Sequence, residues 1–433
     1  MNLSLRRERA LLKYLAILTI IFPAVAVAQP QEWLVTTDMY GNPLYQYLEI
    51  EDTSGALTGN LGGDALKGNR AGSKLHFEAG GSLYDATLGD GEMTGAADMP
   101  DTNDQAKRAQ HSFIARRLPA KPAKPRHIDF VPTSWSNEFS AHKPPVETIW
   151  PGDTVHTTTI DSGGVDEHGV TRALYGNPQT GPFFVGGAMP GDTLAIHIDR
   201  LKLNRDYADS MDTIVSRALT AKMAADAKDL GKPVRWKLDI KNGVARPENA
   251  QGALADFSVP LRPMLGCIAV APDFGFAPFS TGDSGRFGGN MDFNGIVEGA
   301  TVYLPVYQPG ALLYLGDAHA AQGDGETTQY GLETSMDVTF HVEVIHSSVA
   351  TPRVRSTKGI MALGFGGSTE DALRMATAGL AQWLEHDYGL TISQTAQVFG
   401  GAMHYTVSEL ADRNVGVVAW LDADVLKGLK AAK

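Results

Sequence analysis

The sequence predicts a mainly β protein with an α+β C-terminal part. Glycine is frequent, at 47 of 433 residues, and most apolar stretches alternate with polar residues, as half-buried strands do. Helical periodicity is confined to a few segments, of which 214–230 and 369–387 are the clearest. A hydrophobic content of 43% with 20% charged residues is sufficient for a packed core and argues against a disordered chain.

The first 28 residues have the composition of a secretory signal that is cleaved after Ala28. A basic segment is followed by the apolar stretch LAILTIIF and by small residues at 26–28. The apolar stretch is short and ends at Pro23, so we expect no stable membrane span after cleavage. We therefore expect an exported protein, periplasmic or secreted. Export of the folded chain, which the twin Arg6-Arg7 favours, and an N-terminus that stays anchored in the membrane are the alternatives.

The charge and the cysteine content exclude two kinds of protein. The signal segment carries four basic residues and Glu8, a net charge of +3, so its removal changes the net charge from −12 to −15. Such an acidic chain is not expected to bind nucleic acid, whose phosphates need a basic surface. Cys267 is the one cysteine, so no intramolecular disulfide can form, and its apolar surroundings LGCIAVAP predict a buried small hydrophobe.

Two segments precede the main part of the chain. Residues 29–108 alternate apolar and polar residues between glycine-rich turns, which predicts a small module of antiparallel strands. Residues 109–127 contain RRLPAKPAKPR, whose three prolines and five basic residues indicate a stiff, solvated linker. A basic docking patch is the alternative for this segment. We expect residues 128–433 to form the domain that carries the site.

Within 128–433, strands are predicted in several places. The segments 151–161 and 190–203 both open with PGDT, a turn that precedes alternating residues. Residues 300–316 predict two strands joined at Gln308-Pro309-Gly310, and MDVTFHVEVI (336–345) places its apolar residues on one face. The helix at 369–387 begins after Ser368, a suitable N-cap.

Three segments gather polar residues near predicted strand ends: IDSGGVDEHG (160–169), GGNMDFN (288–294) and GDAHAAQGDGE (316–326), which Glu333 follows. Carboxylates with a histidine can bind a divalent metal that lowers the pKa of bound water toward neutrality. Asp292, His319 and Glu333 have the right side chains for such a site. The alternatives are structural, because Asp324 suits a tight turn and a single histidine after a strand is often held by hydrogen bonds.

In their order and spacing, these segments resemble the acetamidase/formamidase family. The resemblance rests on HTTTIDSGG, TGPFFVGGAMPGDTLAIHI, PLRPMLGCIAVAP, GGNMDFN, the stretch from ATVYLPVY to GDGE, LETSMDVTF and DRNVGVVAWL. It covers about residues 128–425 and excludes 29–127. It implies hydrolysis of a short aliphatic amide to a carboxylate and ammonia, a strand-rich core, a homo-oligomer and a divalent metal, for which we expect zinc.

The resemblance also suggests roles for individual residues. We expect Asp292, His319 and Glu333 as metal ligands, Glu326 as general base, Asp324 and Asp161 as further catalytic residues, and Asn290 and Gly289 as substrate-binding residues. Two stretches depart from the family pattern: 276–290, with Asp283 and Arg286, and 401–410, whose aromatic content is bulkier than the family pattern leads us to expect. Both leave the shape of the substrate pocket open.

Two further hypotheses remain at this point. One is an exported protein that binds a ligand on an amidase scaffold without turnover, which the extra module and the departures favour. The other keeps hydrolysis but uses a pair of carboxylates without a metal.

Overall fold

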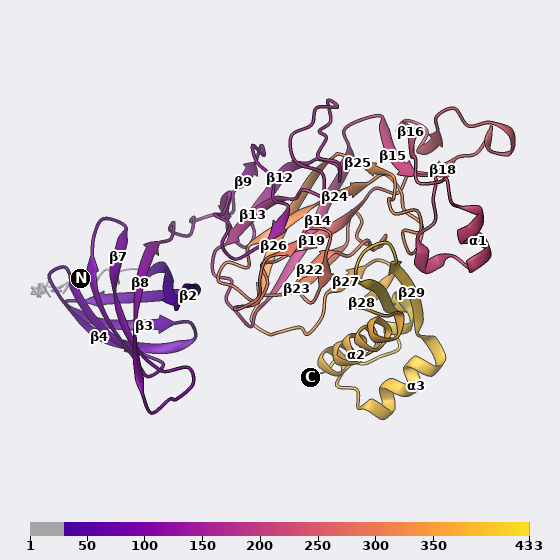
Figure 1. Ribbon diagram of the computed structural model, residues 1–433. Helices are drawn as coiled ribbons and strands as arrows, with labels where there is room; N and C mark the ends of the chain where they lie inside the picture. Colours follow the sequence, from indigo (N-terminus) through magenta and orange to yellow (C-terminus); the bar gives the residue numbers. More distant parts are fainter. Residues whose placement is uncertain (1–29, 433) are drawn as a thin grey trace, which may run out of the picture.

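The computed structural model describes residues 30–432, so the predicted signal segment 1–28 lies outside the described residues. A closed β-barrel is followed by a short connecting segment and then by a larger, strand-rich domain (Figure 1). No helix within 30–432 combines the length and the apolar character needed to cross a membrane.

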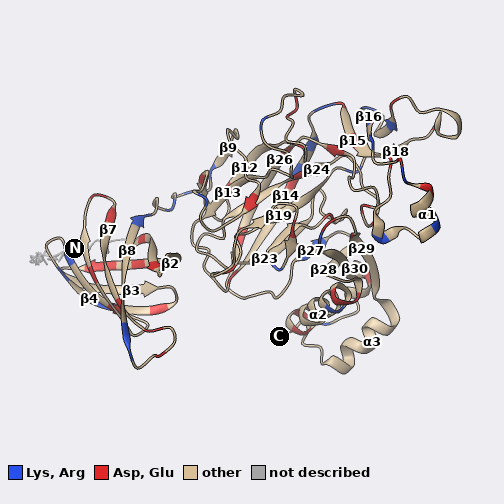
Figure 2. Ribbon diagram, viewed as in Figure 1, with Lys and Arg blue, Asp and Glu red and all other residues tan. Residues whose placement is uncertain are grey.

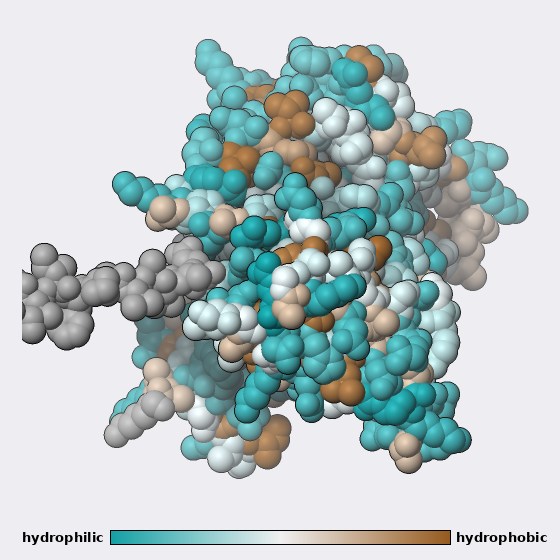
Figure 3. Space-filling view, turned by 90° about the vertical axis from the view of Figure 1, so that its left-hand side faces the viewer, coloured by the Kyte–Doolittle hydropathy of each residue, from teal (hydrophilic) through white to brown (hydrophobic). Residues whose placement is uncertain are grey.

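The barrel consists of eight antiparallel strands that pair in chain order and close between the last and the first. They are β1 (Gln31–Met39), β2 (Asn42–Thr53), β3 (Ala56–Leu61), β4 (Asp64–Ala71), β5 (Lys74–Ala79), β6 (Ser82–Leu88), β7 (Glu92–Pro100) and β8 (Arg108–Arg117). The interior has its own apolar core, in which the rings of Phe77 and Tyr84 stack with centroids 4.8 Å apart. From the barrel side the surface is largely hydrophilic, with apolar residues in small separate groups (Figure 3). The predicted antiparallel module is therefore a closed barrel.

The boundary between module and linker differs from the prediction. Residues 109–117, assigned to the linker, form most of β8 and pair with both β1 and β7. His111, Phe113 and Ala115 alternate into the barrel and are buried, and this period of two outweighs the basic residues around it. The connecting segment thus begins at Leu118. Lys and Arg residues mark the passage from β8 into the larger domain (Figure 2).

Two sheets and a small two-stranded pair make up the larger domain. The eleven-stranded sheet contains β11 (Glu147–Ile149), β13 (Thr180–Val185), β15 (Tyr207–Met211), β16 (Pro233–Asp239), β17 (Val244–Pro247), β18 (Val259–Pro260), β19 (Met264–Ala269), β21 (Ser284–Gly285), β22 (Gly288–Asn290), β24 (Leu313–His319) and β25 (Glu333–Thr334). The nine-stranded sheet contains β9 (His127–Asp129), β12 (Thr154–Thr159), β14 (Thr193–Leu203), β23 (Thr301–Pro305), β26 (Met336–Ile345), β27 (Arg353–Ser356), β28 (Gly359–Gly366), β29 (His404–Glu409) and β30 (Val415–Asp422). β10 (Glu138–Phe139) pairs with β20 (Phe279–Ser280).

The main core lies between the two sheets, because one apolar cluster takes residues from both. β14 and β26 contribute from the nine-stranded sheet, and β19 and β24 from the other. On β26 the predicted alternation is observed, with Met336, Val338, Phe340 and Val342 buried. The two strands predicted around Gln308-Pro309-Gly310 also form, but β23 and β24 enter different sheets, and this crossing of the core places the end of β24 at the site.

The longer helices lie in the C-terminal part of the domain. α2 (Thr369–Tyr388) begins after Ser368, whose hydroxyl accepts from the Asp371 N–H as predicted, and it packs on β28 and β30. α3 (Ile392–Ala402) follows with a capping box at Thr391, and α4 (Ala423–Leu426) ends the domain. The helix predicted at 214–230 is shorter than expected. It splits into η1 (Ser216–Ala218) and α1 (Ala221–Asp226). Neither element buries a side chain, so no packing against the core stabilises a longer helix here. η2 (Gly252–Leu254) is a further single turn.

Candidate active site

The site forms where β24 ends in the middle of the eleven-stranded sheet. Asp317 and His319 lie at this end of β24, and Glu333 on β25 is the direct cross-strand partner of His319. β19 pairs with β24 on one side and with β22 on the other, and Asp292 follows β22. The pairing of these strands therefore brings together residues from 290 to 333. Glu326 reaches the same place from the loop between β24 and β25.

The C-terminal part of the chain supplies two more carboxylates. Glu409 at the end of β29 lies with Asp292 and Glu326, the three offering oxygens within 4.8 Å of one another. Asp412 accepts a hydrogen bond from Asn290 Nδ2 at 2.9 Å. One cluster therefore contains a single histidine and six carboxyl groups, contributed by Asp292, Asp317, Glu326, Glu333, Glu409 and Asp412.

His319 is held between two of these acids. Its Nε2 lies 2.9 Å from Glu333 Oε1 and 3.3 Å from Asp317 Oδ1, and its Nδ1 lies 2.7 Å from Gln322 Oε1. Burial lowers the pKa of His319, but the negative charges of Glu333 and Asp317 outweigh it and raise the pKa well above its usual value. With no cation nearby, the imidazole would therefore be protonated at neutral pH.

The negative forms of the buried acids are unfavourable, because the acids are removed from water and repel one another. Burial, and then the charges of neighbouring acids, raise the pKa values of Asp292 and Glu326 well above the usual range. Burial is also the largest cause that raises the pKa of Glu333, of Glu409 and of Asp412, the last to about 7. Such a group of buried acids is stable only if protons or a cation neutralise part of the charge.

The residues present fit a divalent cation. Three buried oxygens, Asp292 Oδ1, Glu333 Oε2 and Glu409 Oε2, have no hydrogen-bond partner. Within residues 30–432, no Lys or Arg side chain forms an ion pair with any of the six acids. A Cβ added at Gly266 on β19 would lie 2.4 Å from Asp317 Oδ2 and 2.5 Å from Asp292 Oδ1, so this glycine leaves the space in front of both carboxylates open. Oxygen donors with one imidazole suit a divalent metal.

The backbone supports the same interpretation. Asp292, Asp317 and Glu326 all have positive φ angles, of 42°, 55° and 44°. This left-handed conformation is uncommon for residues other than glycine and costs of order ~1 kcal/mol or more at each position. Strain of this kind at three of the buried acids is typical of a functional site, where the surrounding structure holds side chains in a required geometry.

Amides fix one edge of the cluster. Asn290 Nδ2 donates to Asp292 Oδ2 at 2.7 Å, and Asn290 Oδ1 accepts from Asn177 Nδ2 at 2.6 Å. Gln179 in turn donates to Asn177. Gly289, next to Asn290, has a φ of 99°, and a Cβ there would lie 2.1 Å from the Asp283 carbonyl oxygen, so its role is to allow the close approach of two strands.

The structure gathers some of the residues selected from the sequence and separates others. Asp292, His319, Glu333, Glu326 and Asn290 lie in the cluster. Asp324 is exposed outside it and accepts from Asn294 Nδ2 at 2.7 Å, as a turn residue would.

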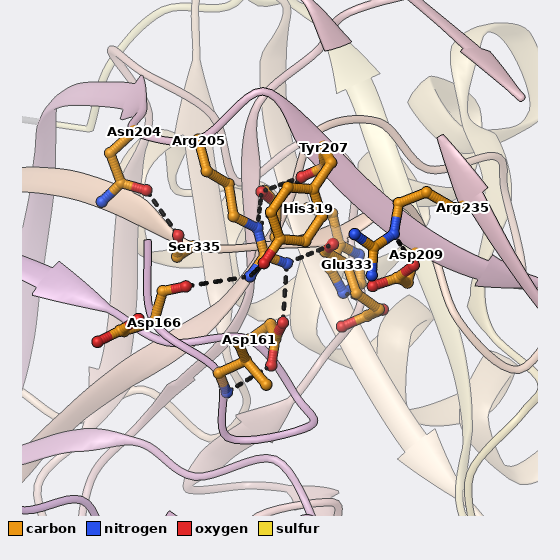
Figure 4. Close-up of polar contacts among 12 residues, drawn as sticks. Asp161, Asp166, Asn204, Arg205, Tyr207, Asp209, Arg235, His319, Glu333 and Ser335 are labelled. Carbon is orange, nitrogen blue, oxygen red and sulfur yellow. Dashed lines mark hydrogen bonds and ion pairs between the residues drawn. The ribbon is translucent and has the colours of Figure 1, made fainter. Parts of the chain in front are cut away.

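Asp161 is a correction of another kind, because a neighbour neutralises it. The Arg205 guanidinium, whose side chain is 1% exposed, donates to Asp161 Oδ2 at 2.8 Å and to the Glu333 carbonyl oxygen at 3.1 Å (Figure 4). Asp161 therefore belongs to a buried ion pair that supports β25, and it contributes no oxygen to the carboxylate groups around His319.

Sequence reasoning assigned no role to Asp317, Glu409 and Asp412. Asp317 lies inside the motif that contains His319, and its position two residues earlier on the same strand is a usable signal. Glu409 lies within the stretch 401–410 and Asp412 begins the segment DRNVGVVAWL, but both meet the other acids only in three dimensions. Cys267 is buried as predicted, and burial raises its pKa, so it is no thiolate nucleophile.

A small cavity of about 130 Å³ opens onto the cluster. Asp317, Glu326, Glu333, Asn290 and Asp412 line its inner side, and its outer side includes two tyrosines whose hydroxyl oxygens lie 2.6 Å apart, Tyr175 and Tyr330. Larger cavities of about 770 and 570 Å³ lie elsewhere; of these, the second also touches Glu326. We assign the chemistry to the small cavity, because it alone among the three borders several of the acids.

The fold and this cluster define a strand-rich protein with a buried carboxylate–histidine centre. Known proteins are similar to it in sequence and in fold. A sequence model described as the Acetamidase/Formamidase family matches residues 279–366. The chain is similar to a crystal structure of a predicted acetamidase/formamidase from Thermoanaerobacter tengcongensis, at 26% identity and a TM-score of 0.60, covering 70% of this chain and 98% of the other. An acetamidase from Yersinia enterocolitica gives 26% identity and a TM-score of 0.61 over 70% and 94%.

Among curated proteins, a putative formamidase of Schizosaccharomyces pombe is 36% identical over 70 residues, which is 16% of this chain and 17% of the relative. An acetamidase of Mycolicibacterium smegmatis is 37% identical over 65 residues, 15% and 16% of the two chains. The aligned segments thus span about a sixth of the curated relatives. Residues 279–366 thus match the acetamidase/formamidase family, and the fold is similar to that of solved structures described as acetamidases.

Proposed function

We propose that this protein is an amidohydrolase that cleaves a short aliphatic amide, of the formamide or acetamide type, to a carboxylate and ammonia. The observation that carries the proposal is the buried group of six acids and one histidine at a cavity of about 130 Å³. Sites for drug-sized ligands measure roughly 300–1,000 Å³, so this cavity suits a substrate with only a few non-hydrogen atoms. The names of the family members support the same substrate class.

We propose Asp292, His319 and Glu333 as ligands of a divalent cation, for which we expect zinc, with Asp317 and Glu409 as further candidates. When bound, the cation would supply Lewis acidity and a water of lowered pKa. Asp292, Glu333 and Glu409 would then exist as carboxylates, because the cation replaces the protons that their raised pKa values otherwise require. Asn290 would keep Asp292 in place through its hydrogen bond.

Two acids remain for proton transfer. Glu326 is our proposed general base: the Gly331 N–H holds its Oε1 at 2.7 Å, and the side chain borders the cavity. Asp412, whose pKa is raised to about 7, is suited to donate a proton to the leaving amine. Tyr175 and Tyr330 would exclude larger amides at the outer side of the cavity.

The test is ammonia release from formamide, acetamide and longer amides, together with elemental analysis of the purified protein. Asp292→Asn and His319→Ala should each lower the rate by more than ~100-fold and lower the metal content, since both remove a ligand. Asp324→Asn is the matched control, because this exposed acid lies outside the cluster. Full activity in both ligand variants would refute the assignment.

The same measurements decide between the remaining hypotheses. Turnover by a metal-free preparation would favour a pair of carboxylates without a metal. Binding of an amide without release of ammonia would favour a ligand-binding protein on an amidase scaffold. We also propose that the chain is exported to the periplasm or the medium and that it forms a homo-oligomer. N-terminal sequencing of the mature protein in fractionated cells and its mass in solution test these two points.

A further inference from the structure

A second group of metal-binding side chains lies on the nine-stranded sheet, away from the carboxylate cluster. His197 on β14 and His341 on β26 are direct cross-strand partners, and Glu343 follows His341 by two residues on the same face. One nitrogen of each ring and one carboxylate oxygen lie within 4.8 Å of one another. From these residues we propose a second binding site for a divalent transition metal such as Zn²⁺, formed by His197, His341 and Glu343.

The hydrogen bonds of the two rings favour this use. His341 Nδ1 lies 2.8 Å from Asp199 Oδ2, and His197 Nδ1 lies 3.0 Å from Thr301 Oγ1. A metal-binding histidine commonly has its second nitrogen held in this way by a carboxylate or another polar group, which fixes the ring and leaves the other nitrogen for the ion. Here the Nε2 atom of each ring is the one left over.

One of these nitrogens is also an unpartnered buried atom. His197 Nε2 is hidden from solvent and has no hydrogen-bond partner, and its nearest acidic oxygen is Glu343 Oε2 at 3.5 Å. A buried polar atom without a partner costs free energy. A metal ion at this place would satisfy it and would also offset the two negative charges of Glu343 and Asp199.

The ligand types indicate the class of ion. Two imidazoles and one carboxylate suit zinc, nickel or copper, whereas calcium and magnesium prefer oxygen ligands alone. The rings are now parallel, with an interplanar angle of 4° and centroids 4.3 Å apart. Binding therefore requires both rings to tilt about their Nδ1 hydrogen bonds, so that the two Nε2 atoms approach a common point. Their partial exposure, 26% for His197 and 32% for His341, leaves room for that rotation and for the ion to enter.

The experiment counts zinc on the full chain. The protein is stripped with a chelator, dialysed against buffered Zn²⁺ and analysed for metal per chain, as wild type and as His341→Gln, His197→Gln and His156→Gln. His156 is the matched control, since it lies on the same sheet beside its own partner Asp129 but outside the group. We expect His341→Gln and His197→Gln each to retain one zinc fewer than wild type, and His156→Gln to retain as many.

A second readout separates this site from the carboxylate cluster. The loss of one zinc in His341→Gln should leave ammonia release unchanged, because the residue is remote from the small cavity. If the cluster binds no metal at all, the wild type should still retain the one equivalent that His341→Gln loses. Equal zinc in wild type and His341→Gln, or an equal loss in His156→Gln, would overturn the proposal. Matching melting temperatures of the zinc-free variants check that all of them fold alike.

Discussion

The buried ion pair of Arg205 with Asp161 gives the sharpest prediction about stability. The Arg205 side chain is 1% exposed and that of Asp161 is 8% exposed, with 2.8 Å between Nη2 and Oδ2. Besides Asp161, Arg205 donates to Thr334 Oγ1 at 3.0 Å and to the Glu333 carbonyl oxygen at 3.1 Å. Arg205→Met keeps the length of the side chain but leaves the Asp161 charge buried and unpaired. Removing one partner of such a pair costs ~3–5 kcal/mol.

The chain offers a control of nearly the same design. Arg235 lies over the ring of Tyr207 at 4.0 Å, as Arg205 does at 4.2 Å, and pairs with Asp209 at 2.6 Å (Figure 4). Its side chain is 46% exposed and that of Asp209 is 30% exposed, so water screens the pair. Loss of an exposed ion pair costs ~1 kcal/mol or less. Arg235→Met should therefore cost only a fraction of what Arg205→Met costs.

Urea unfolding followed by circular dichroism measures both differences in the free energy of unfolding. Adding Asp161→Asn to Arg205→Met should restore part of the loss, because the unpaired charge is then gone. Arg205→Met should also lower the rate of ammonia release, since Arg205 holds the backbone of Glu333. Equal losses of stability in Arg205→Met and Arg235→Met would refute the reasoning, because burial would then make no difference to the two pairs.

Three further predictions concern other parts of the chain. Gly289→Ala should destabilise the protein by more than ~2 kcal/mol in urea unfolding, because of its positive φ and the contact with Asp283, whereas Gly323→Ala, with open space around it, should change little. After chelation of metal, the free energy of unfolding should fall as the pH rises from about 4 through about 7, because folded Asp412 keeps a proton that the unfolded chain releases. The rise of its pKa from 3.8 to about 7 corresponds to ~4 kcal/mol. Asp412→Asn should remove this part of the pH profile. Removal of residues 30–117 should leave a folded domain that still releases ammonia, because the barrel has its own core; loss of turnover on truncation would give the barrel a part in the site.

The sequence by itself determined the local features of this protein. Alternation predicted the inward residues of β26, the glycine-rich turns predicted an antiparallel module, and Ser368 marked the start of α2. These features depend on residues a few positions apart, so a single chain displays them directly. The motif residues Asp292, His319, Glu326 and Glu333 could also be selected, because their spacing resembles that of a family.

Only the tertiary structure decided which acids meet. Glu409 joins Asp292 although more than a hundred positions separate them, because β29 and β22 lie in different sheets whose packing no local pattern encodes. Asp161 was a reasonable candidate until the fold placed Arg205 against it, and Asp324 until the loop turned it outward. The sequence shows the same Asp or Glu whether the carboxylate is paired with a cation, solvated or surrounded by other acids. Its burial and its neighbours decide its chemistry, and both are properties of the folded chain.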